Sequence, residues 1–251
     1  MNAITASSWP YPHWIAHRGA GKLAPENTLA AFRLGAQHGY RMFECDAKLS
    51  ADGVPFLLHD ATLERTTNGR GTGGDLPLGA LAQLDAGSWH SRAYAGEAVP
   101  TLEALARFCI ANGYFLNIEI KPTPGQEETT GRVVGETAAR LWQGQAVPPL
   151  FSSFKPDALA GAQATAAHIP RALLLDTLWD GCLDTARRLG CVAIVCNHAL
   201  WDAALVAQVK GMGMRTLSYT VNDDWAAQRL IALGTDGIIT DRVDLFSPAT
   251  P

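Results

Sequence analysis

The sequence predicts an α/β fold, a TIM-type (β/α)8 barrel, in a single domain that spans residues 1–251. The length is one reason, because the usual size of such a barrel is about 250 residues. A second is that short β-rich runs alternate with helix-like stretches, which implies parallel strands joined by right-handed crossovers. A third excludes the main alternative, a doubly wound open sheet, because its glycine-rich phosphate fingerprint is absent after the first strand.

Eight short runs have the composition of buried strands and are predicted to form the barrel. In chain order they are Trp14–His17, Met42–Ala47, Phe115–Ile120, Leu150–Ser153, Ala172–Leu175, Val192–Cys196, Thr216–Val221 and Gly237–Thr240. The predicted helices between them include Glu26–His38, Leu102–Asn112, Val133–Gln143, Pro156–Ala167, Ala203–Gly211 and Asp224–Leu233. Several helical stretches end near a glycine suited to a left-handed C-cap, namely Gly39, Gly113, Gly144, Gly190 and Gly234.

A hairpin is predicted after the second strand. The Asp-Gly pair at 52–53 lies between two strand-like runs, which is a strong signal for a two-residue turn, and such a turn joins antiparallel neighbours. The run Pro55–His59 is therefore an excursion at the rim rather than a ninth barrel strand. With this turn Asp46 lies opposite His59, and Glu44 points to the same face. The hairpin is expected to bring two carboxylates and an imidazole onto one surface.

A long irregular insertion follows, over approximately residues 61–100, and it is rich in Gly, Thr and Asp. Such a segment inside a compact domain is usually a lid or a binding loop. Because it follows His59 directly, we expect it to lie over the site.

Polar side chains gather at the predicted carboxyl ends of neighbouring strands, where the active sites of such barrels lie. The second strand presents Glu44 and Asp46, and the third presents Glu119 with Lys121 on the same face. Two carboxylates about 4 Å apart repel each other by roughly 4 kcal/mol at an effective dielectric near 20, so three of them must protonate or bind a cation. An all-oxygen set selects a hard divalent ion such as magnesium, calcium or manganese. The alternative is that Glu44 and Glu119 only form ion pairs with Arg18 and Lys121.

His17 and His59 each end an apolar run beside this acidic cluster. They are the candidates for acid–base catalysis, since histidine titrates nearest neutral pH. A carboxylate neighbour should raise the pKa of His59 and favour it as the proton donor. Arg18 offers a planar set of donors for phosphate, and Lys121 offers a point charge. A metal, two cations and two histidines together predict a phosphoryl-transfer site.

Composition limits the other classes of protein. The net charge of −4 gives no reason to expect a nucleic-acid partner. No apolar run approaches the roughly 20 residues that cross a bilayer, and no basic amphipathic segment indicates stable membrane association. The N-terminus lacks the pattern of a signal peptide, and five cysteines without metal-ligand spacing favour reduced thiols, so we expect a cytoplasmic protein. The expected partner is a small-molecule substrate, and the oligomeric state stays open.

Several motifs follow one another over nearly the whole chain. They are Ile15-Ala16-His17-Arg18-Gly19, Ala24-Pro25-Glu26-Asn27-Thr28, Glu44-Cys45-Asp46, His59-Asp60, Leu63-Glu64-Arg65-Thr66-Thr67-Asn68-Gly69, Asn117-Ile118-Glu119-Ile120-Lys121, Thr220-Val221-Asn222 and Gly237-Ile238-Ile239-Thr240-Asp241. In this order they closely resemble the motifs of the glycerophosphodiester phosphodiesterase family, and most closely those of its cytoplasmic bacterial enzymes.

The resemblance implies a phospholipase-C-like barrel in which residues 61–100 are the family's insertion. It implies metal-dependent hydrolysis of deacylated phospholipids, such as glycerophosphocholine and glycerophosphoethanolamine, to sn-glycerol-3-phosphate and an alcohol. The implied roles are one divalent metal ion held by Glu44, Asp46 and Glu119, an acid–base pair of His17 and His59, and phosphate contacts from Arg18 and Lys121. The glycerol 2-hydroxyl would attack phosphorus with His17 as base and His59 as acid, giving a cyclic phosphate that water opens.

Some interpretations stay open. Tyr219 stands where many members of the family have a Trp, and it either lines the glycerol pocket or only packs. Glu26 and Asn27 most simply cap the first helix, although Asn27 lies close enough to the rim to contact the site. Two other functions compete: a lysophospholipase D-like enzyme acting on lipids that keep one acyl chain, and a non-catalytic barrel that binds a phosphodiester.

Overall fold

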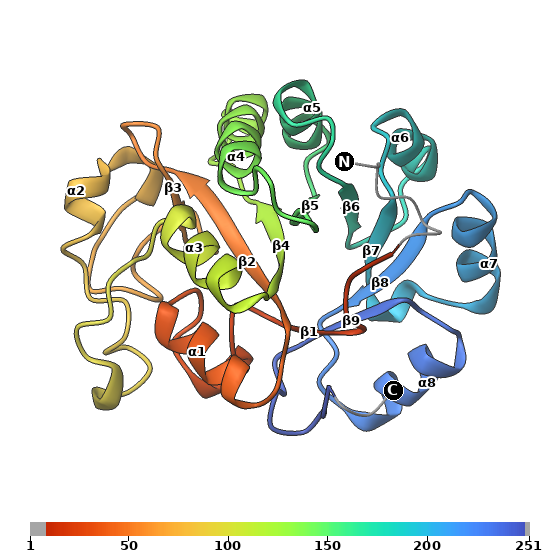
Figure 1. The fold of residues 1–251 in the computed structure, drawn as a ribbon, viewed down its shortest axis with the longest axis horizontal. Coiled ribbons are helices and arrows are strands. Elements are labelled where there is room, and N and C mark those ends of the chain that lie inside the picture. The colour runs from red at the N-terminus through yellow and green to blue at the C-terminus, as the bar shows by residue number, and fades with distance from the viewer. Residues whose placement is uncertain (1–8, 249–251) are drawn as a thin grey trace.

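The computed structural model describes residues 9–248 and confirms the predicted barrel. Its parallel sheet closes because β1 (Trp14–Ala16) pairs with both β2 (Met42–Leu49) and β9 (Gly237–Thr240). The other barrel strands are β4 (Phe115–Ile120), β5 (Leu150–Ser153), β6 (Arg171–Leu175), β7 (Ala193–Asn197) and β8 (Arg215–Tyr219). Figure 1 shows the strands at the centre of the molecule and the helices around them. The predicted strand positions agree with these to within two residues at each end.

The additional strand β3 (Pro55–Leu57) pairs antiparallel with β2 outside the barrel, as predicted, but the predicted register was wrong by one residue. Ala47 faces Leu57, so the position opposite Asp46 belongs to Leu58, whose amide donates to the Asp46 carbonyl at 3.1 Å. His59 lies beyond the end of β3. It therefore reaches the site because the chain leaves the strand, not because of strand alternation.

The turn of this hairpin explains the shift in register. Its loop has three residues rather than two, and Ser50 and Val54 close it with a backbone hydrogen bond of 3.0 Å. Gly53, the last loop residue, has φ +77°, a left-handed conformation that glycine adopts without a steric penalty. A three-residue loop that ends in this conformation is a common hairpin connection. The extra loop residue moves every facing pair by one position.

Seven helices cover the outside of the barrel in the described part of the chain (Figure 1). They are α1 (Leu29–Gln37), α3 (Leu102–Asn112), α4 (Glu127–Leu141), α5 (Pro156–Thr165), α6 (Cys182–Arg188), α7 (Ala203–Gly211) and α8 (Asp224–Ala232). The prediction for α1 began three residues too early, because Thr28 is the N-cap and its hydroxyl accepts from the Ala31 amide. Glu26 and Asn27 therefore do not cap this helix and are available to the site.

Helix α4 begins six residues before its predicted start. Its first half contains Thr and Gly, which have low helix propensity, but a close crossing with α5 requires the glycines. A Cβ on Gly131 would lie 2.0 Å from the Ala158 carbonyl oxygen, and one on Gly161 would lie 2.2 Å from that of Glu128. Contact between the two backbones thus stabilises a helix that propensity alone does not predict.

Apolar side chains fill one end of the barrel interior and leave the other end polar. The interior cluster includes Met42 of β2 together with Ile15, Leu150, Leu174, Leu217 and Ile239. Along β2, Met42, Glu44 and Asp46 share the inward face, whereas Phe43 and Cys45 pack outward against the helices. Cys45 thus points away from the site. The carboxylates occupy the layer above the apolar floor.

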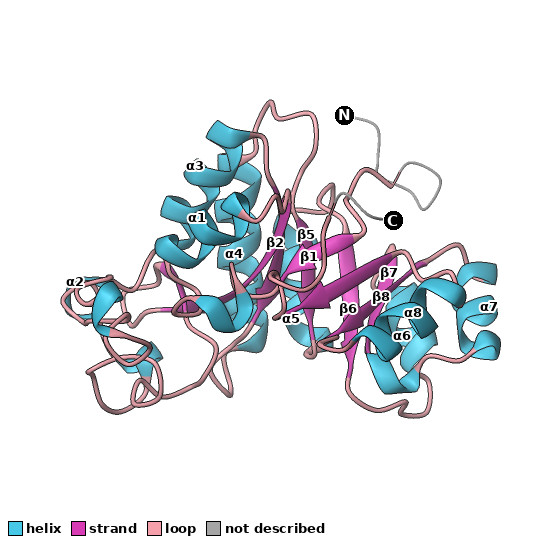
Figure 2. Ribbon diagram, turned by 90° about the horizontal axis from the view of Figure 1, so that it is seen from below, coloured by secondary structure: helices cyan, strands magenta, loops and turns pink. Residues whose placement is uncertain are grey.

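The irregular insertion lies beside the barrel, next to α1 and α3, and contains the short helix α2 (Leu78–Leu81) (Figures 1 and 2). It has a small core of its own, in which Leu63, Leu81 and Val99 pack on Phe56 of β3. It was expected to cover the site, but it flanks it: the cavity that holds the carboxylates has no lining residue from the insertion. None of the described helices is long and apolar enough to cross a membrane.

Candidate active site

Three carboxylates meet at the polar end of the barrel. Glu44 and Asp46 project from β2 and Glu119 from β4, and the register of the two strands sets Asp46 beside Glu119. One oxygen of each lies within 4.8 Å of the others, and all three side chains are buried. Of the two ion pairs named above as the alternative, the one between Glu119 and Lys121 is present, with Oε1 2.9 Å from Nζ. Glu44 receives the backbone amide of Arg18 at 3.1 Å instead.

Burial and mutual repulsion shift the pKa values of these acids in different directions. Burial, and then the charge of Asp46, raises the pKa of Glu119 to about 7 and that of Glu44 well above its usual range. Burial alone would also raise the pKa of Asp46, but the nearby charges of Arg18, Lys121 and His59 lower it below its usual range. The cluster therefore lacks enough positive charge to keep all three carboxylates ionised.

The donor set fits a divalent cation. Glu44 Oε1 and Asn117 Oδ1 are buried and have no hydrogen-bond partner among residues 9–248. Asn117 stands beside Glu44 in the strand register and lines the same cavity. Buried oxygens without donors are costly unless something else pairs with them. Since all these ligands are oxygens, a hard ion such as magnesium or calcium is the natural occupant.

His17 lies at the edge of this cluster, and Asp241 holds its imidazole ring through Nδ1. Its Nε2 is 3.7 Å from Glu44 Oε2, and its Nδ1 is 2.7 Å from Asp241 Oδ1. Asn222 fixes Asp241 in turn, donating Nδ2 to Oδ2 at 2.9 Å and accepting the Asp241 amide at 2.9 Å. Because a carboxylate engages Nδ1, the Nε2 atom is the one presented to the cavity.

His59 repeats this arrangement on the other side of the cluster. Its Nδ1 lies 2.7 Å from Asp60 Oδ1, and Arg65 of the insertion donates Nε to Asp60 Oδ2 at 2.6 Å. Lys121 Nζ lies 2.8 Å from His59 Nε2. An ammonium group can only donate, so Nε2 is the acceptor here and the proton of the neutral ring is on Nδ1.

The expectation that a carboxylate would raise the pKa of His59 was wrong. Burial lowers this pKa, and the charges of Arg18 and Lys121 add to the effect, so that together they outweigh the opposing charge of Asp46. The protonated form of His59 is consequently a stronger acid than an exposed histidine.

Arg18 and Asn27 hold the carboxylates from the loop between β1 and α1. Arg18 Nε lies 3.1 Å from Asp46 Oδ2, and Asn27 donates Nδ2 to the same oxygen at 2.8 Å. Both residues have positive φ, +51° and +58°, and they are the only non-glycine residues of the described chain that do. Such backbone conformations carry a cost of about 1–3 kcal/mol and concentrate at functional sites. The hydrogen bond from Asn27 to Asp46 confirms the predicted contact of Asn27 with the site.

Glu26 links the loop to the insertion. It accepts from Arg18 Nη1 at 2.9 Å and from both terminal nitrogens of Arg65 at 2.7 and 2.8 Å. Burial opposes ionisation of Glu26, but the two guanidinium groups lower its pKa overall. A continuous chain of charges thus runs from Arg18 through Glu26, Arg65 and Asp60 to His59.

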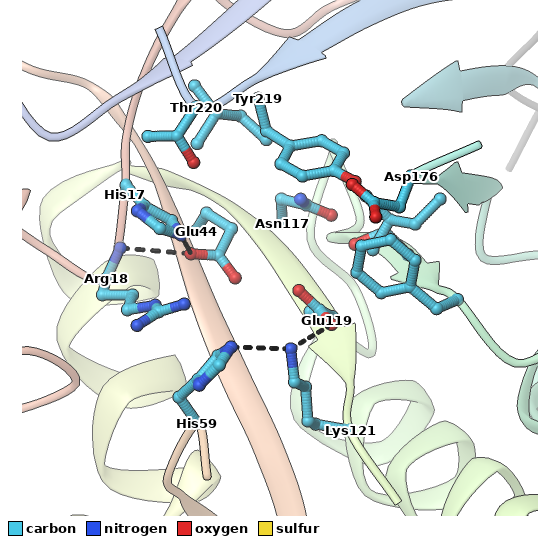
Figure 3. A pocket seen from close by; sticks show the side chains of 14 residues that line it. His17, Arg18, Glu44, His59, Asn117, Glu119, Lys121, Asp176, Tyr219 and Thr220 are labelled. Carbon is cyan, nitrogen blue, oxygen red and sulfur yellow. Dashed lines mark hydrogen bonds and ion pairs between the residues drawn. The ribbon is translucent and has the colours of Figure 1, made fainter. Parts of the chain in front are cut away.

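The far end of the cavity is aromatic. The Tyr219 ring packs edge-on against Phe154 at 5.7 Å, and both residues line the cavity, which has a volume of about 240 Å³. The Tyr219 hydroxyl lies 3.2 Å from the Leu175 carbonyl oxygen. Figure 3 shows Tyr219 and Asp176 on one side of the carboxylates and His17, Arg18 and His59 on the other. Tyr219 therefore does more than pack, since it lines the cavity as well as contacting Phe154.

Every residue predicted for the site lines this one cavity except Asp46, which lies beneath it and contacts Arg18 and Asn27. The residues that hold the histidines and Arg18 were not predicted from the sequence to belong to the site, and Glu26 was interpreted as a helix cap. They are Glu26, Asp60, Arg65, Asn222 and Asp241. Each of them stands in one of the quoted motifs, but only the fold shows which polar groups they contact.

Comparison with known proteins is consistent with this geometry. The model of the glycerophosphoryl diester phosphodiesterase family matches residues 17–245. A glycerophosphodiester phosphodiesterase of Caldanaerobacter subterraneus subsp. tengcongensis is 33% identical over 233 residues, which cover 90% of this chain and 93% of that protein. A phosphodiesterase of Oleispira antarctica, solved in complex with the product sn-glycerol-3-phosphate, superimposes with a TM-score of 0.90 at 34% identity and covers 99% of this chain and 100% of its own. A glycerophosphodiester phosphodiesterase of Agrobacterium tumefaciens gives a TM-score of 0.75 at 29% identity, with 94% and 99% of the two chains covered.

Proposed function

The chain belongs to the glycerophosphoryl diester phosphodiesterase family, and from this we propose that it hydrolyses glycerophosphodiesters to sn-glycerol-3-phosphate and an alcohol. Deacylated phospholipids such as glycerophosphocholine and glycerophosphoethanolamine are the substrate class. The observation that carries the proposal is the position of two carboxylate-backed histidines on either side of a carboxylate cluster, within one cavity that also presents Arg18 and Lys121.

Glu44, Asp46 and Glu119 would hold one divalent metal ion, magnesium or calcium, with manganese as a further candidate. When bound, the ion supplies positive charge that stabilises the phosphoryl oxygens and keeps the carboxylates ionised. Arg18 and Lys121 would bind the remaining phosphate oxygens, the first through a planar set of donors and the second as a point charge. Arg18 Nε and Lys121 Nζ each lie within 4 Å of an Asp46 carboxylate oxygen, so the Asp46 carboxylate positions both cations.

The histidines would carry the proton transfers. His17 Nε2 accepts the proton of the glycerol 2-hydroxyl as that oxygen bonds to phosphorus. The bond from phosphorus to the alcohol oxygen breaks, and His59 Nε2 protonates that oxygen. A cyclic glycerol phosphate remains, and water opens it with the two histidines in exchanged roles. Contact of phosphate with Lys121 would release the Nε2 atom of His59 that Lys121 occupies in this structure, and Nε2 would then take a proton from solvent before it acts as the acid.

The glycerol arm would lie toward Tyr219, Phe154 and Asp176. These residues offer ring faces for the carbon atoms and a carboxylate for a hydroxyl group. The volume of the whole cavity, about 240 Å³, suits a three-carbon alcohol better than an acyl chain.

The test compares three compounds in an assay for released glycerol-3-phosphate. We expect turnover of glycerophosphocholine, much slower turnover of lysophosphatidylcholine, and no turnover of an analogue that lacks the glycerol 2-hydroxyl. Faster turnover of the lysolipid would favour the lysophospholipase D alternative, and binding without turnover of any compound would favour a non-catalytic barrel. Equal turnover of the 2-deoxy analogue would refute the intramolecular attack.

A further inference from the structure

A second cavity, of about 430 Å³, adjoins the catalytic one and shares His17 and Arg18 with it. We call it the outer cavity. One wall comes from the loop between β1 and α1 and the other from the insertion, and its lining includes Lys22, Glu26, Arg65, Trp89 and His90. Of the site residues predicted from the sequence, only His17 and Arg18 line the outer cavity.

A phosphodiester carries two arms on one phosphorus atom, and the two cavities meet at Arg18, a residue expected to bind its phosphate. The glycerol arm must stay near the metal ligands, because its 2-hydroxyl attacks phosphorus. Figure 3 shows the aromatic end of the catalytic cavity on the side of the carboxylates away from Arg18. The other arm is thus left to extend past Arg18 into the outer cavity.

We propose that the outer cavity is the subsite for the leaving alcohol, and that it selects uncharged, hydroxyl-rich alcohols such as glycerol and inositol over choline. This inference rests on the function proposed above. It assigns a role to the insertion, which contributes Arg65, Trp89 and His90 to the subsite but no residue to the catalytic cavity.

The charges that line the outer cavity disfavour a cationic head group. The carboxylates in its lining are Glu26 and Asp241, and both are already paired: Glu26 with two guanidinium groups, Asp241 with His17 and Asn222. Lys22 is exposed and has no ion pair among residues 9–248. Arg18 and Arg65 are also paired, both with Glu26 and in addition with Asp46 and Asp60, respectively. Among residues 9–248, Lys22 is thus the cation of this lining that no carboxylate neutralises, and its charge repels a quaternary ammonium group but donates hydrogen bonds to hydroxyl oxygens.

Trp89 supplies an apolar surface beside these donors. Its indole nitrogen donates to the Ala86 carbonyl oxygen at 2.8 Å, and its ring packs edge-on against His90 at 5.6 Å. The side chain is nonetheless 40% exposed. The ring faces are free to contact a ligand. An indole face also attracts a quaternary ammonium group, but the positive charge of Lys22 in the same lining opposes that attraction. Such a ring face suits the C–H groups of a polyol, while Lys22 and Arg65 reach its hydroxyls.

His59 does not line the outer cavity, but a chain of contacts connects it to that lining. Arg65 lines the outer cavity and is the residue that holds Asp60, which in turn engages Nδ1 of His59. The proposed proton donor and the proposed alcohol subsite are thus joined by a single guanidinium group.

The test measures kcat/KM for four diesters of sn-glycerol-3-phosphate, whose second alcohol is glycerol, inositol, choline or methanol. Methanol is the smallest of these alcohols and can make the fewest contacts in the outer cavity. Each value is therefore expressed relative to the methyl ester, which makes the ratios independent of the amount of folded enzyme. We expect the wild type to prefer inositol and glycerol to choline. Trp89→Ala should lower the inositol-to-methyl ratio by at least about fivefold. Lys22→Glu should raise the choline-to-inositol ratio by about threefold.

Trp225→Ala is the matched control, since Trp225 is 74% exposed and lines neither cavity. Its ratios should equal those of the wild type. Ratios unchanged by both Trp89→Ala and Lys22→Glu would overturn the subsite while leaving the proposed function intact, and a wild-type preference for choline would overturn the selectivity for polyols. Failure of the wild type to cleave any of the four diesters would instead refute the proposed function itself.

Discussion

Nδ1 of His17 lies 2.7 Å from Oδ1 of Asp241, a residue 224 positions later in the chain. The same distance separates Nδ1 of His59 from Oδ1 of its neighbour Asp60. Each carboxylate is held by a further residue, Asn222 for Asp241 and Arg65 for Asp60. Two independent carboxylate–imidazole pairs thus face one cavity, each with Nε2 directed inward, which is the arrangement that proton transfer on both sides of a phosphorus atom requires.

Removal of either histidine should nearly abolish turnover. We expect His17→Ala and His59→Ala to lower kcat for glycerophosphocholine by about 100- to 10,000-fold, the usual contribution of a positioned acid or base. A diester with p-nitrophenol as its alcohol needs no proton donor, so His59→Ala should recover much of its rate on that compound and His17→Ala should not. The opposite pattern would reverse the two roles. Circular dichroism checks that both variants are folded.

Asp241→Asn should lower kcat much more than it changes KM. The amide can no longer accept the imidazole Nδ1–H as a carboxylate does, so the wrong tautomer is favoured and Nε2 is no longer available as a base. We expect a fall in kcat of at least about tenfold with KM within about twofold of the wild-type value. Asp244→Asn is the control, since Asp244 pairs only with Arg242 on the surface. An equal effect of both substitutions would contradict the positioning role.

Arg65 should affect catalysis although it lies outside the catalytic cavity. Arg65→Ala removes both the support of Asp60 and the link to Glu26, so we expect kcat to fall by about tenfold, and by less on the p-nitrophenyl diester. Arg65→Lys keeps the charge but cannot bond two carboxylates with one planar group, so it should restore little. Arg107→Ala is the control, because among residues 9–248 the ion pair of Arg107 is an exposed one with Glu103. Full activity of Arg65→Ala would refute the role.

Removal of divalent metal should stop the reaction and lower thermal stability. A cation bound by three mutually repelling carboxylates stabilises the folded state by mass action, so the melting temperature should rise as magnesium or calcium is added to chelated protein. Glu119→Gln should remove most of this rise, whereas Glu103→Gln, which alters an exposed pair, should keep it. An equal rise in all three proteins would place the metal elsewhere.

The metal-free protein should lose stability as the pH rises from about 4.5 to about 7. Burial, followed by the charge of Asp46, raises the pKa of Glu119 from 4.5 to about 7, so in this range the folded state binds more protons than the unfolded state. Linkage then requires the free energy of unfolding to decrease with increasing pH. Urea titrations of the chelated wild type and of Glu119→Gln, at pH 5 and pH 7, measure the difference. A wild-type slope no steeper than that of the variant would contradict the assignment.

The barrel and its strands could be predicted from the sequence, and so could most of the carboxylates, histidines and cations that line the catalytic cavity. This was possible because a parallel α/β barrel places its strand ends at one face, so residues such as Glu44 and Glu119 can be located from strand periodicity alone. Local signals sufficed for these features, since hydrophobic patterns and turn residues depend on neighbours in the chain.

Which groups hold the site residues became clear only from the folded arrangement of the chain. His17 contacts Asp241, Arg65 contacts Glu26, and Trp89 lines the outer cavity together with residues of the loop between β1 and α1. These residues are far apart in the chain, and no sequence periodicity encodes contacts between such distant segments. The hairpin register shows the same limit on a smaller scale, because one additional loop residue with positive φ at Gly53 set Asp46 opposite Leu58. The pKa of His59 followed burial and the surrounding cations, which depend on the packed structure and not on the adjacent residues alone.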